Sequence, residues 1–440
     1  MSSPVVVKFS SPFIRFYGLV SPCVSVNLQS KVYRLVSGRC MSTSPTPTPP
    51  PQCLMKPINV PMKTLMGPGP SNCPPRVLNA NALPLLGHLH PEFTQIMDEI
   101  KEGIKYAFQT ENTWTVCVSG TGHAAMEASV CNLIEPGDKV LACVNGLWGE
   151  RFAEMAQRHD GDVATIDIPM GTVFTLQDIE NGLKENRPAI MFITHGESSG
   201  TTVQPLEGIG ELCHKYNCIL IVDSVAAMGG VPLFMDKWEI DVVYSGAQKV
   251  LSAPPGASPI SFSARARQKV ENRKTKVRSY YFDMHHLANY WGCDKEPRRY
   301  HHTGPISNAY ALREGLARLA EESLENSWAN HVKCVHKLHE GLESLGLKLF
   351  VTDKLARLPC VTIIFQLARL PCVTGVVVPD GVNWKDVADF AMKHYRVEIS
   401  GGLGAQAGKI WRIGLMGHNC TEHNVNLVLR ALGEALKNVK

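Results

Sequence analysis

The fold is decided by two apolar stretches that each end in a charged residue: Cys218-Ile-Leu-Ile-Val-Asp223 and Asp241-Val-Val-Tyr-Ser-Gly-Ala-Gln-Lys249. Their composition predicts two neighbouring buried strands. Alone, neither charge is informative, because an aspartate after a strand usually caps the following turn and a single lysine is usually solvated. Lys249, however, is followed by the turn Ala253-Pro-Pro-Gly-Ala257 and has few charges nearby. Burial at such a position lowers the pKa of a lysine and frees its amine as a nucleophile.

Together, Asp223 and Lys249 satisfy the requirements of pyridoxal phosphate chemistry. A lysine forms a Schiff base with the aldehyde of this cofactor. A carboxylate on the opposite side of the ring keeps the pyridine nitrogen protonated, so that the ring accepts electrons. Two adjacent strand ends supply both groups, and we therefore expect a pyridoxal phosphate enzyme.

An alternation of strand and helix patterns begins near residue 62 and predicts a mostly parallel sheet covered by helices, hence an α/β fold. The expected strands are residues 113–119, 139–143, 163–166, 189–194, 218–222 and 241–245, and the main expected helices are residues 92–109, 150–159, 176–186 and 208–216. A long helical pattern over 307–345 leads into a smaller α+β region. Ligands of such sheets bind at the carboxyl ends of the strands, where the candidate residues cluster.

Four segments are predicted along the chain: a leader (1–40), a Pro-rich arm (41–61), a large cofactor-binding domain (62–322) and a small C-terminal domain (323–440). The small domain contains a duplication within 355–374, because Leu355-Ala-Arg-Leu-Pro-Cys-Val-Thr362 recurs unchanged as residues 367–374. Its prolines, Pro359 and Pro371, predict edge or loop positions for both copies. The second copy leads into an apolar run that predicts the proper strand.

Residues 1–40 contain five basic residues and no acidic one, as mitochondrial transit peptides do. We therefore expect this segment to direct the protein to mitochondria. The alternatives are a leader that is merely disordered and a peroxisomal or cytosolic form of the protein that starts at Met41. Without these residues the net charge changes from +4 to −1, so the basic balance is no argument for nucleic-acid binding. No apolar run has the length of a membrane span, and the spacing of cysteines and histidines does not indicate a metal site.

A glycine-rich turn, Ser119-Gly-Thr-Gly-His123, lies between an expected strand and an expected helix. Free amides at a helix start, with the side chains of Thr121 and His123, suit a phosphate. The same residues fit a dinucleotide-binding fingerprint, Gly120-x-Gly-x-x-Ala125. That fingerprint needs an acidic residue at the end of the next strand to bind the ribose, and none is present there. A turn without a ligand is the third possibility.

Three further residues have both a functional and a structural interpretation. Trp148, after the strand at 139–143, suits the face of a planar cofactor but also ordinary packing. The hydroxyl of Ser198 is placed to reach the cofactor ring or to form a turn. Arg412 lies in an apolar strand-like run and requires an anion, either a substrate carboxylate or an internal acidic side chain.

The assembled pattern resembles the alanine–glyoxylate (serine–pyruvate) aminotransferases, which are class V aminotransferases of fold type I. The resemblance extends from about Pro50 to the C-terminus. The matching stretches are Leu65-Met-Gly-Pro-Gly-Pro-Ser-Asn72, Gln95-Ile-Met-Asp-Glu-Ile-Lys-Glu-Gly103, Thr194-His-Gly-Glu-Ser-Ser199, Leu220-Ile-Val-Asp-Ser-Val225, Tyr244-Ser-Gly-Ala-Gln-Lys249, Ala288-Asn-Tyr-Trp-Gly-Cys293, Tyr300-His-His-Thr303 and Trp411-Arg-Ile-Gly-Leu415.

The resemblance implies a seven-stranded, mostly parallel sheet in the large domain, and a homodimer with a shared active site. It implies that Lys249 carries the Schiff base, Asp223 pairs with the pyridine nitrogen, Trp148 stacks on the ring, Ser198 contacts the ring region and Arg412 binds the substrate α-carboxylate. The implied phosphate ligands are Thr121, Gly122, His123 and Gln248, with Tyr300 and Thr303 from the partner subunit. The family has one copy of the duplicated segment, and the start of its mammalian cytosolic members aligns with Met41.

The expected reaction transfers an amino group from alanine or serine to glyoxylate, giving pyruvate or hydroxypyruvate and glycine by ping-pong kinetics. Sequence does not separate these small substrates, which differ by one or two heavy atoms. A pyridoxal-dependent desulfurase would need a mobile cysteine facing the cofactor, and no cysteine is placed for it. A nicotinamide oxidoreductase and a non-enzymatic interaction protein are the alternatives from other classes.

Overall fold

The structure, a computed structural model, describes residues 48–352 and 368–439. The chain divides into two compact units, residues 1–61 and residues 62–440. The described part of the first unit contains one short 3-10 helix, η1 (Gln52–Leu54), and exposes the apolar side chains of Leu54, Met55 and Ile58. The predicted leader, Met41 and most of the Pro-rich run lie outside the described residues.

The second unit is built around a seven-stranded sheet with the order β2-β10-β9-β8-β5-β3-β4. Its strands are β2 (Trp114–Ser119), β3 (Lys139–Val144), β4 (Asp162–Asp167), β5 (Ile190–Thr194), β8 (Ile219–Asp223), β9 (Val242–Tyr244) and β10 (Ala257–Phe262). Strand β10 runs antiparallel to both neighbours, and the other pairs are parallel. Strands β5 and β8 are buried throughout, as expected where helices cover both faces. The predicted α/β class and mostly parallel sheet are confirmed.

Strand β10 did not emerge from the sequence pattern, because Pro259 lies in its middle and prolines are rare inside sheets. In the structure Pro259 pairs with Cys117 of β2, and its carbonyl accepts a hydrogen bond from Ser245 N (2.9 Å). Pairing with β9 begins only at Ile260, so the missing N–H of Pro259 falls outside that pairing. The strand therefore tolerates a proline between two neighbours.

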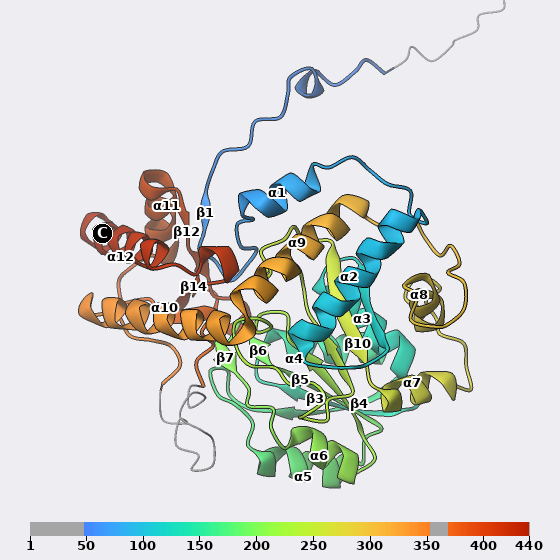
Figure 1. The fold of residues 1–440 in the computed structure, drawn as a ribbon. Helices are drawn as coiled ribbons and strands as arrows, with labels where there is room; N and C mark the ends of the chain where they lie inside the picture. The colour runs from blue at the N-terminus through green and yellow to red at the C-terminus, as the bar shows by residue number, and fades with distance from the viewer. Residues whose placement is uncertain (1–47, 353–367, 440) are drawn as a thin grey trace, which may run out of the picture. The chain divides into compact units, whose positions relative to one another are not determined.

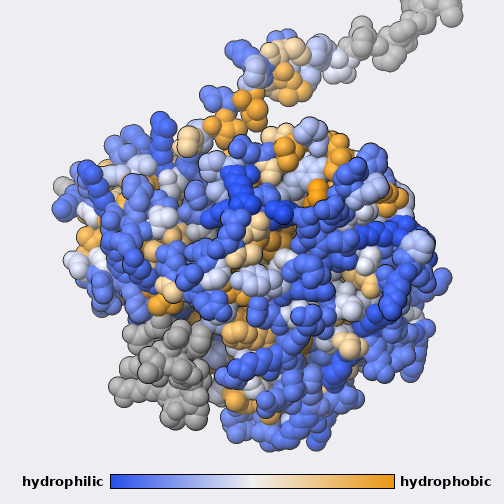
Figure 2. Space-filling model, in the orientation of Figure 1, coloured by the Kyte–Doolittle hydropathy of each residue, from blue (hydrophilic) through white to orange (hydrophobic). Residues whose placement is uncertain are grey.

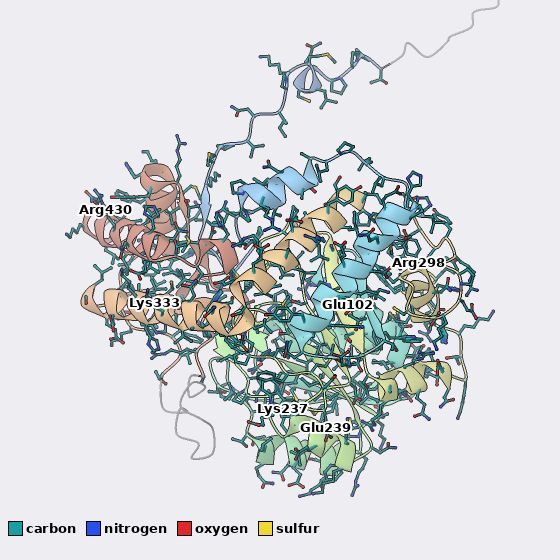
Figure 3. The ribbon with its side chains drawn as sticks, viewed as in Figure 1. Glu102, Lys237, Glu239, Arg298, Lys333 and Arg430 are labelled. Atoms are coloured by element: carbon teal, nitrogen blue, oxygen red, sulfur yellow. The ribbon has the colours of Figure 1, made fainter. Side chains whose placement is uncertain are left out.

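Helices cover this sheet, with α5 and α6 together on one side and α2 and α9 on another (Figure 1). Their bounds are α1 (Pro75–Asn81), α2 (Pro91–Phe108), α3 (Gly122–Leu133), α4 (Leu147–Arg158), α5 (Leu176–Asn186), α6 (Ile209–Lys215), α7 (Ala264–Glu271), α8 (Met284–Tyr290) and α9 (Ile306–Glu322). Helix α2 is amphipathic: Met97, Ile100 and Ile104 are buried, whereas Glu102 points outward (Figure 3). The face shown in Figure 2 is mostly hydrophilic, with hydrophobic residues near α1.

The single long helix predicted over 307–345 is wrong. Two helices, α9 and α10 (Leu324–Ser344), meet at Ser323, whose φ of 70° breaks the helical path. The Ser323 hydroxyl accepts a hydrogen bond from Asn326 N (3.3 Å) and so caps α10. The apolar periodicity continues across this break, which explains why the pattern predicted one helix.

A smaller C-terminal domain with its own apolar core completes the fold, as predicted. Its three-stranded antiparallel sheet has the order β11-β14-β13, formed by β11 (Val373–Val377), β14 (Ile410–Gly414) and β13 (Ser400–Gly401). Beside it lie α10, α11 (Trp384–Tyr395) and α12 (Glu422–Asn438). The short helix η3 (Gly404–Gln406) lies between β13 and β14 in the sequence, and η4 (Gly417–Asn419) lies between β14 and α12. Strand β1 (Thr64–Leu65) pairs in parallel with β12 (Val397–Glu398). The boundary at 322/323 remains a prediction.

The second copy of the duplicated segment is described from Ala368 onward and packs against the hairpin of β6 (Gly196–Glu197) and β7 (Thr202–Val203). Val203 N donates to Ala368 O (2.9 Å), and Leu370 N donates to Thr201 O (3.0 Å). Leu370 is buried, Pro371 lies in a turn, and β11 follows, as the sequence predicted for this copy. The first copy lies outside the described residues.

Among the described helices, none combines the length and the apolar character that crossing a membrane requires.

Candidate active site

Most of the predicted site residues follow strands whose carboxyl ends meet at one edge of the sheet. Thr194 of β5 is paired with Asp223 of β8, and Asp223 is paired with Tyr244 of β9, so these three strands end in register. The turn that opens α3 follows β2, and α4 follows β3. In a parallel sheet this edge is where ligands bind.

The Asp223 carboxylate is buried at the end of β8 and held by two hydrogen bonds. Oδ1 accepts from Val225 N (2.8 Å), and Oδ2 accepts from the Tyr244 hydroxyl (2.9 Å). Burial raises the pKa of Asp223 to about 6, whereas these hydrogen bonds and the charge of Lys249 act in the opposite direction. Such a fixed, buried carboxylate is suited to pairing with a protonated ring nitrogen.

Lys249 lies in the loop after β9 and not at the strand end predicted for it, because β9 ends at Tyr244. Its amine donates a hydrogen bond to Pro68 O. Burial lowers the pKa of Lys249 to about 8; Asp223 raises that pKa, and the charge of Arg412 lowers it further. A substantial fraction of the amine is therefore neutral, and nucleophilic, near pH 8.

The glycine-rich turn opens α3, as predicted. Thr121 is the N-cap residue but makes no side-chain capping bond, and the amides of Gly122 and His123 have no partner among the described residues. The helix start therefore offers free donors to an anion. The position is also closely packed, because a Cβ on Gly122 would lie 3.0 Å from Val225 Cγ2, so that Val225 would have to shift slightly to accept it.

The side chains around this turn add further polar groups. Arg151 of α4 donates to His123 Nε2 (2.8 Å). Burial and the neighbouring Arg151 charge both lower the pKa of His123. The amide oxygen of Gln248 is buried without a partner among the described residues, which marks its side chain as open to a ligand.

Trp148 and Ser198 contact each other directly. The indole Nε1 donates to Ser198 Oγ (3.0 Å), and the Trp148 ring meets the His123 ring edge-on at 5.5 Å between centroids. Trp148 is the second residue of α4 rather than part of the preceding loop, and Ser198 follows β6. The structure thus brings both residues to the carboxyl edge near the turn that opens α3.

Arg412 is buried in β14 and is oriented by backbone carbonyls. Nε donates to Gly401 O (2.9 Å), and Nη1 donates to Ser198 O (3.3 Å). Burial lowers the pKa of Arg412 to about 10, so the guanidinium stays charged at neutral pH. Within the part of the chain that the structure describes, it forms no ion pair, which disfavours the internal salt bridge that the sequence left open.

Tyr300 and Thr303 lie on the segment between α8 and α9, with the Tyr300 hydroxyl 3.4 Å from Thr303 Oγ1. Tyr300 is 55% exposed, and no hydrogen bond connects either residue to the other candidate site residues within 48–352 and 368–439. The segment is nevertheless attached near the site, because His302 Nε2 lies 2.6 Å from Ser119 Oγ at the end of β2.

Comparison with known proteins gives a match to the family model "Aminotransferase class-V" over residues 69–428. The chain belongs to the class-V aminotransferase family. This assignment confirms the resemblance found in the sequence, and it excludes the nicotinamide oxidoreductase and the interaction protein.

Several relatives of this class-V aminotransferase are similar over nearly their whole length. A Callithrix jacchus protein named alanine–glyoxylate aminotransferase is 51% identical, with 91% of this chain and 94% of the relative covered. A Drosophila melanogaster protein of the same name is 48% identical, with 89% and 97% covered. A crystal structure of an alanine–glyoxylate aminotransferase from Nostoc sp. is 46% identical, covers 87% of this chain and 97% of its own, and superimposes with a TM-score of 0.82. The predicted fold-type I architecture is confirmed.

The residues of this class-V aminotransferase fit a planar aldehyde cofactor that carries a phosphate. The free amides at the start of α3 suit a phosphate, and the fixed Asp223 carboxylate suits a pyridinium. The unpartnered atom of Gln248 is its amide oxygen, an acceptor, so Gln248 would have to turn its amide nitrogen toward a phosphate to bind it. Lys249 supplies the amine, and the Arg412 guanidinium remains available for a second anion.

Two site features escaped prediction. Glu197 is buried beside Trp148 and Ser198, although its signal is visible: it is the only acidic residue between Glu185 and Glu207. Gly69 approaches Lys249 so closely that a Cβ there would lie 2.6 Å from Lys249 Nζ. No local pattern indicates that contact, because the two residues are far apart in the sequence.

Proposed function

We propose that this class-V aminotransferase uses pyridoxal phosphate to move an amino group from alanine or serine to glyoxylate, producing pyruvate or hydroxypyruvate and glycine. The observation that carries the proposal is the arrangement of three groups: the nucleophilic amine of Lys249, the buried carboxylate of Asp223 and the guanidinium of Arg412. Asp223 lies at the carboxyl edge of the seven-stranded sheet, and Arg412 reaches Ser198 O near that edge from β14 of the C-terminal domain. The names of the similar proteins support the choice of substrates.

The proposed cofactor contacts use each group according to its chemistry. Lys249 would hold the aldehyde carbon, Asp223 the pyridine nitrogen, and Trp148 the ring face, with Ser198 beside the ring. The phosphate would be held by Thr121, Gly122, His123 and Gln248, with Tyr300 and Thr303 from a partner subunit. When bound, pyridoxal phosphate supplies an electron sink for the electrons released at the substrate α-carbon.

The protein supplies proton transfer and orientation. Lys249 Nζ, with a pKa lowered to about 8, takes a proton from the substrate α-carbon and later returns one. Arg412 binds the α-carboxylate of either substrate through its guanidinium, which Gly401 O and Ser198 O hold in place. Asp223 keeps its negative charge opposite the ring nitrogen. One site thus serves the amino donor and the keto acceptor in turn.

Steady-state assays with alanine or serine as donor, and glyoxylate or pyruvate as acceptor, test this function. We expect parallel lines in double-reciprocal plots, because the first product leaves the enzyme before the second substrate binds. Among the acceptors, we expect the highest kcat/KM with glyoxylate. A Lys249→Ala variant should lose turnover and the absorption of lysine-bound cofactor. Intersecting lines, or a Lys249→Ala protein that retains both properties, would refute the assignment.

A homodimer with a shared site follows from the same proposal. The support is an exposed apolar surface on α1 and the segment after it, which includes Leu78 (51% exposed), Leu83 (55%) and Leu85 (71%), close to where Figure 2 shows hydrophobic residues. A contiguous exposed apolar surface is typical of protein interfaces, whereas single exposed apolar residues are not.

Mixed dimers distinguish a shared site from two separate sites. If Tyr300 acts in the partner's site, a Lys249→Ala chain combined with a Tyr300→Ala chain rebuilds one intact site. We therefore expect the mixture to exceed the activity of either variant alone, up to about half of the normal activity per mixed dimer. Activity equal to the average of the two variants would contradict sharing, and light scattering would show whether the mixed species formed.

We also propose that residues 1–40 direct the chain to mitochondria, with a form starting at Met41 remaining peroxisomal or cytosolic. Tagged full-length and Met41-initiated chains expressed in cells should have different distributions. Identical distributions would remove the transit-peptide proposal without affecting the enzymatic one.

A further inference from the structure

The Glu197 carboxylate is buried in the β6–β7 hairpin and accepts three hydrogen bonds. Oε1 accepts from Ser199 N (2.8 Å) and from Ser199 Oγ (2.6 Å), and Oε2 accepts from Trp148 N (3.2 Å). No ion pair to Glu197 occurs within residues 48–352 and 368–439, so backbone and hydroxyl donors alone hold this acid. Burying an acid without a counter-charge is costly, and here only hydrogen bonds offset that cost.

Helix α4 lacks a cap from its own sequence, because its N-cap residue is Gly146, which has no side chain to offer. The first two free amides of the helix are satisfied from the hairpin instead. Leu147 N donates to Ser199 Oγ (3.0 Å), and Trp148 N donates to Glu197 Oε2. A carboxylate at a helix N-terminus also interacts favourably with the helix dipole. Glu197 and Ser199 therefore cap α4 from a distant part of the chain.

The contact is too close to permit a side chain on the helix. A Cβ on Gly146 would lie 2.5 Å from Glu197 Cδ and 2.6 Å from Ser199 Oγ. Glycine at the N-cap position is thus required by the hairpin, and the loss of a local cap is compensated by the acid.

The same hairpin also contacts the groups proposed to bind cofactor and substrate. Ser198 Oγ accepts from the Trp148 indole, and Ser198 O accepts from Arg412 Nη1. The charge of Glu197 raises the pKa of Arg412. Residues 197–199 thus connect the aromatic ring on α4 with the guanidinium on β14.

We propose that Glu197 is a positioning residue that caps α4 from the β6–β7 hairpin and so fixes Trp148 and Ser198 relative to Arg412. This inference rests on the proposed function for the roles of Trp148 and Arg412, but the cap itself belongs to the protein without cofactor. Glutamine at position 197 keeps the shape of the side chain but turns one acceptor into a donor. One of the three donors, Trp148 N or those of Ser199, would then face another donor.

The test compares Glu197→Gln with Asp241→Asn, a change at a second buried acid, which lies at the opposite end of the sheet and, unlike Glu197, is within ion-pair distance of Arg265 (3.1 Å) and His214 (3.2 Å). Asp241 accepts hydrogen bonds from Leu220 N (3.0 Å) and Ser263 Oγ (2.8 Å) and contacts none of the proposed ligands. In the cofactor-free, full-length protein, Glu197→Gln should accelerate hydrogen exchange of the Leu147 and Trp148 amides about tenfold, as expected for loss of a cap. Asp241→Asn should leave these amides unchanged.

In the cofactor-loaded enzyme, Glu197→Gln should alter the visible circular dichroism of the cofactor and raise KM for both substrates more than it lowers kcat. Ser199→Ala, a milder variant, should show the same changes to a smaller degree and serves if Glu197→Gln does not fold. Unchanged hydrogen exchange of the Leu147 and Trp148 amides would overturn the proposal. It would also be overturned if faster exchange showed that the cap was lost while KM stayed the same. Exchange is measured without turnover, so a failure of the proposed function would appear separately, as absent transamination in the unmodified enzyme.

Discussion

At the scale of single residues, Gly69 determines the space available to Lys249. Its φ of 113° is unfavourable for a side chain, and a Cβ would lie 2.6 Å from both Lys249 Cδ and Nζ. Gly69→Ala should therefore displace the amine and lower kcat/KM about 10²-fold, the effect of a misplacement on the order of 1 Å. The measurements are steady-state kinetics and the absorbance of lysine-bound cofactor.

Gly137→Ala is the control for backbone strain. Gly137 has a comparable φ of 83°, but a Cβ there would have nothing within 4 Å. This variant should lose a little stability and no activity. If both variants lowered activity equally, strain in the backbone rather than contact with Lys249 would be responsible.

The pKa of Lys249 predicts how cofactor attachment depends on pH. Only the neutral amine attacks an aldehyde, so the rate of attachment to the cofactor-free protein should rise about tenfold per pH unit below pH 8 and level off above it. Because the charge of Arg412 lowers this pKa, Arg412→Met should move the inflection to higher pH. Stopped-flow absorbance measures both rates. A profile without inflection between pH 7 and 9.5 would contradict the assigned pKa.

At the scale of elements, the second copy of the duplicated segment makes the contacts that join the hairpin of β6 and β7 to β11. Arg369 Nε donates to Val351 O (2.8 Å), so the chain on the two sides of residues 353–367 lies close together. Deleting residues 355–366 leaves residues 353, 354 and 367 to rejoin these ends. We expect the shortened protein to keep its activity within about twofold, because Arg412 keeps its pairing with Gly375.

Leu370→Asp in the full-length chain is the contrasting variant, because Leu370 is fully buried in the copy that packs. An uncompensated buried acid should destabilise the protein by several kcal/mol and reduce expression. Loss of activity on deletion, with retention of activity in Leu370→Asp, would reverse the roles assigned to the two copies.

Sequence patterns predicted elements best where one physical signal dominated. The apolar runs of β5 and β8 are buried on both faces and were predicted to within one residue, as was the amphipathic helix α2. Strand β10 was missed because Pro259 opposes the strand signal, and the break at Ser323 was missed because apolar spacing continues through it. Site residues with a chemical signature of their own were predicted. Glu197 was not, because its significance lies in a contact with a helix about fifty residues away.

At the scale of the whole molecule, buried neutral histidines make the protein sensitive to acid. His339 is buried on α10, with Nε2 3.1 Å from Thr374 Oγ1, and burial lowers the pKa of His339 to about 3. The unfolded chain binds a proton near pH 6.5 that the folded protein does not bind, so the free energy of unfolding falls as pH drops below 6.5.

The unfolding free energy of the unmodified protein should decrease between pH 7 and pH 5. In His339→Gln this decrease should be smaller by about 2 kcal/mol when both proteins are measured at the same cofactor concentration. The measurement is urea unfolding of both proteins at the two pH values. His423→Gln, a change at an exposed histidine, serves as the control and should leave the decrease unchanged. Equal decreases in His339→Gln and in the unmodified protein would show that His339 is not responsible.

The pairing of β1 with β12 has a consequence for biosynthesis. Residues near the beginning of the second unit are joined to residues near its end: Thr64 pairs with Val397, and Ser71 Oγ donates to Met416 O across 345 residues of sequence. A ribosome makes the chain from its N-terminus, so Thr64 and Ser71 emerge long before their partners exist. The nascent chain must keep this segment unpaired until translation is almost complete, and chaperones that shield it during that interval should increase the yield of active protein.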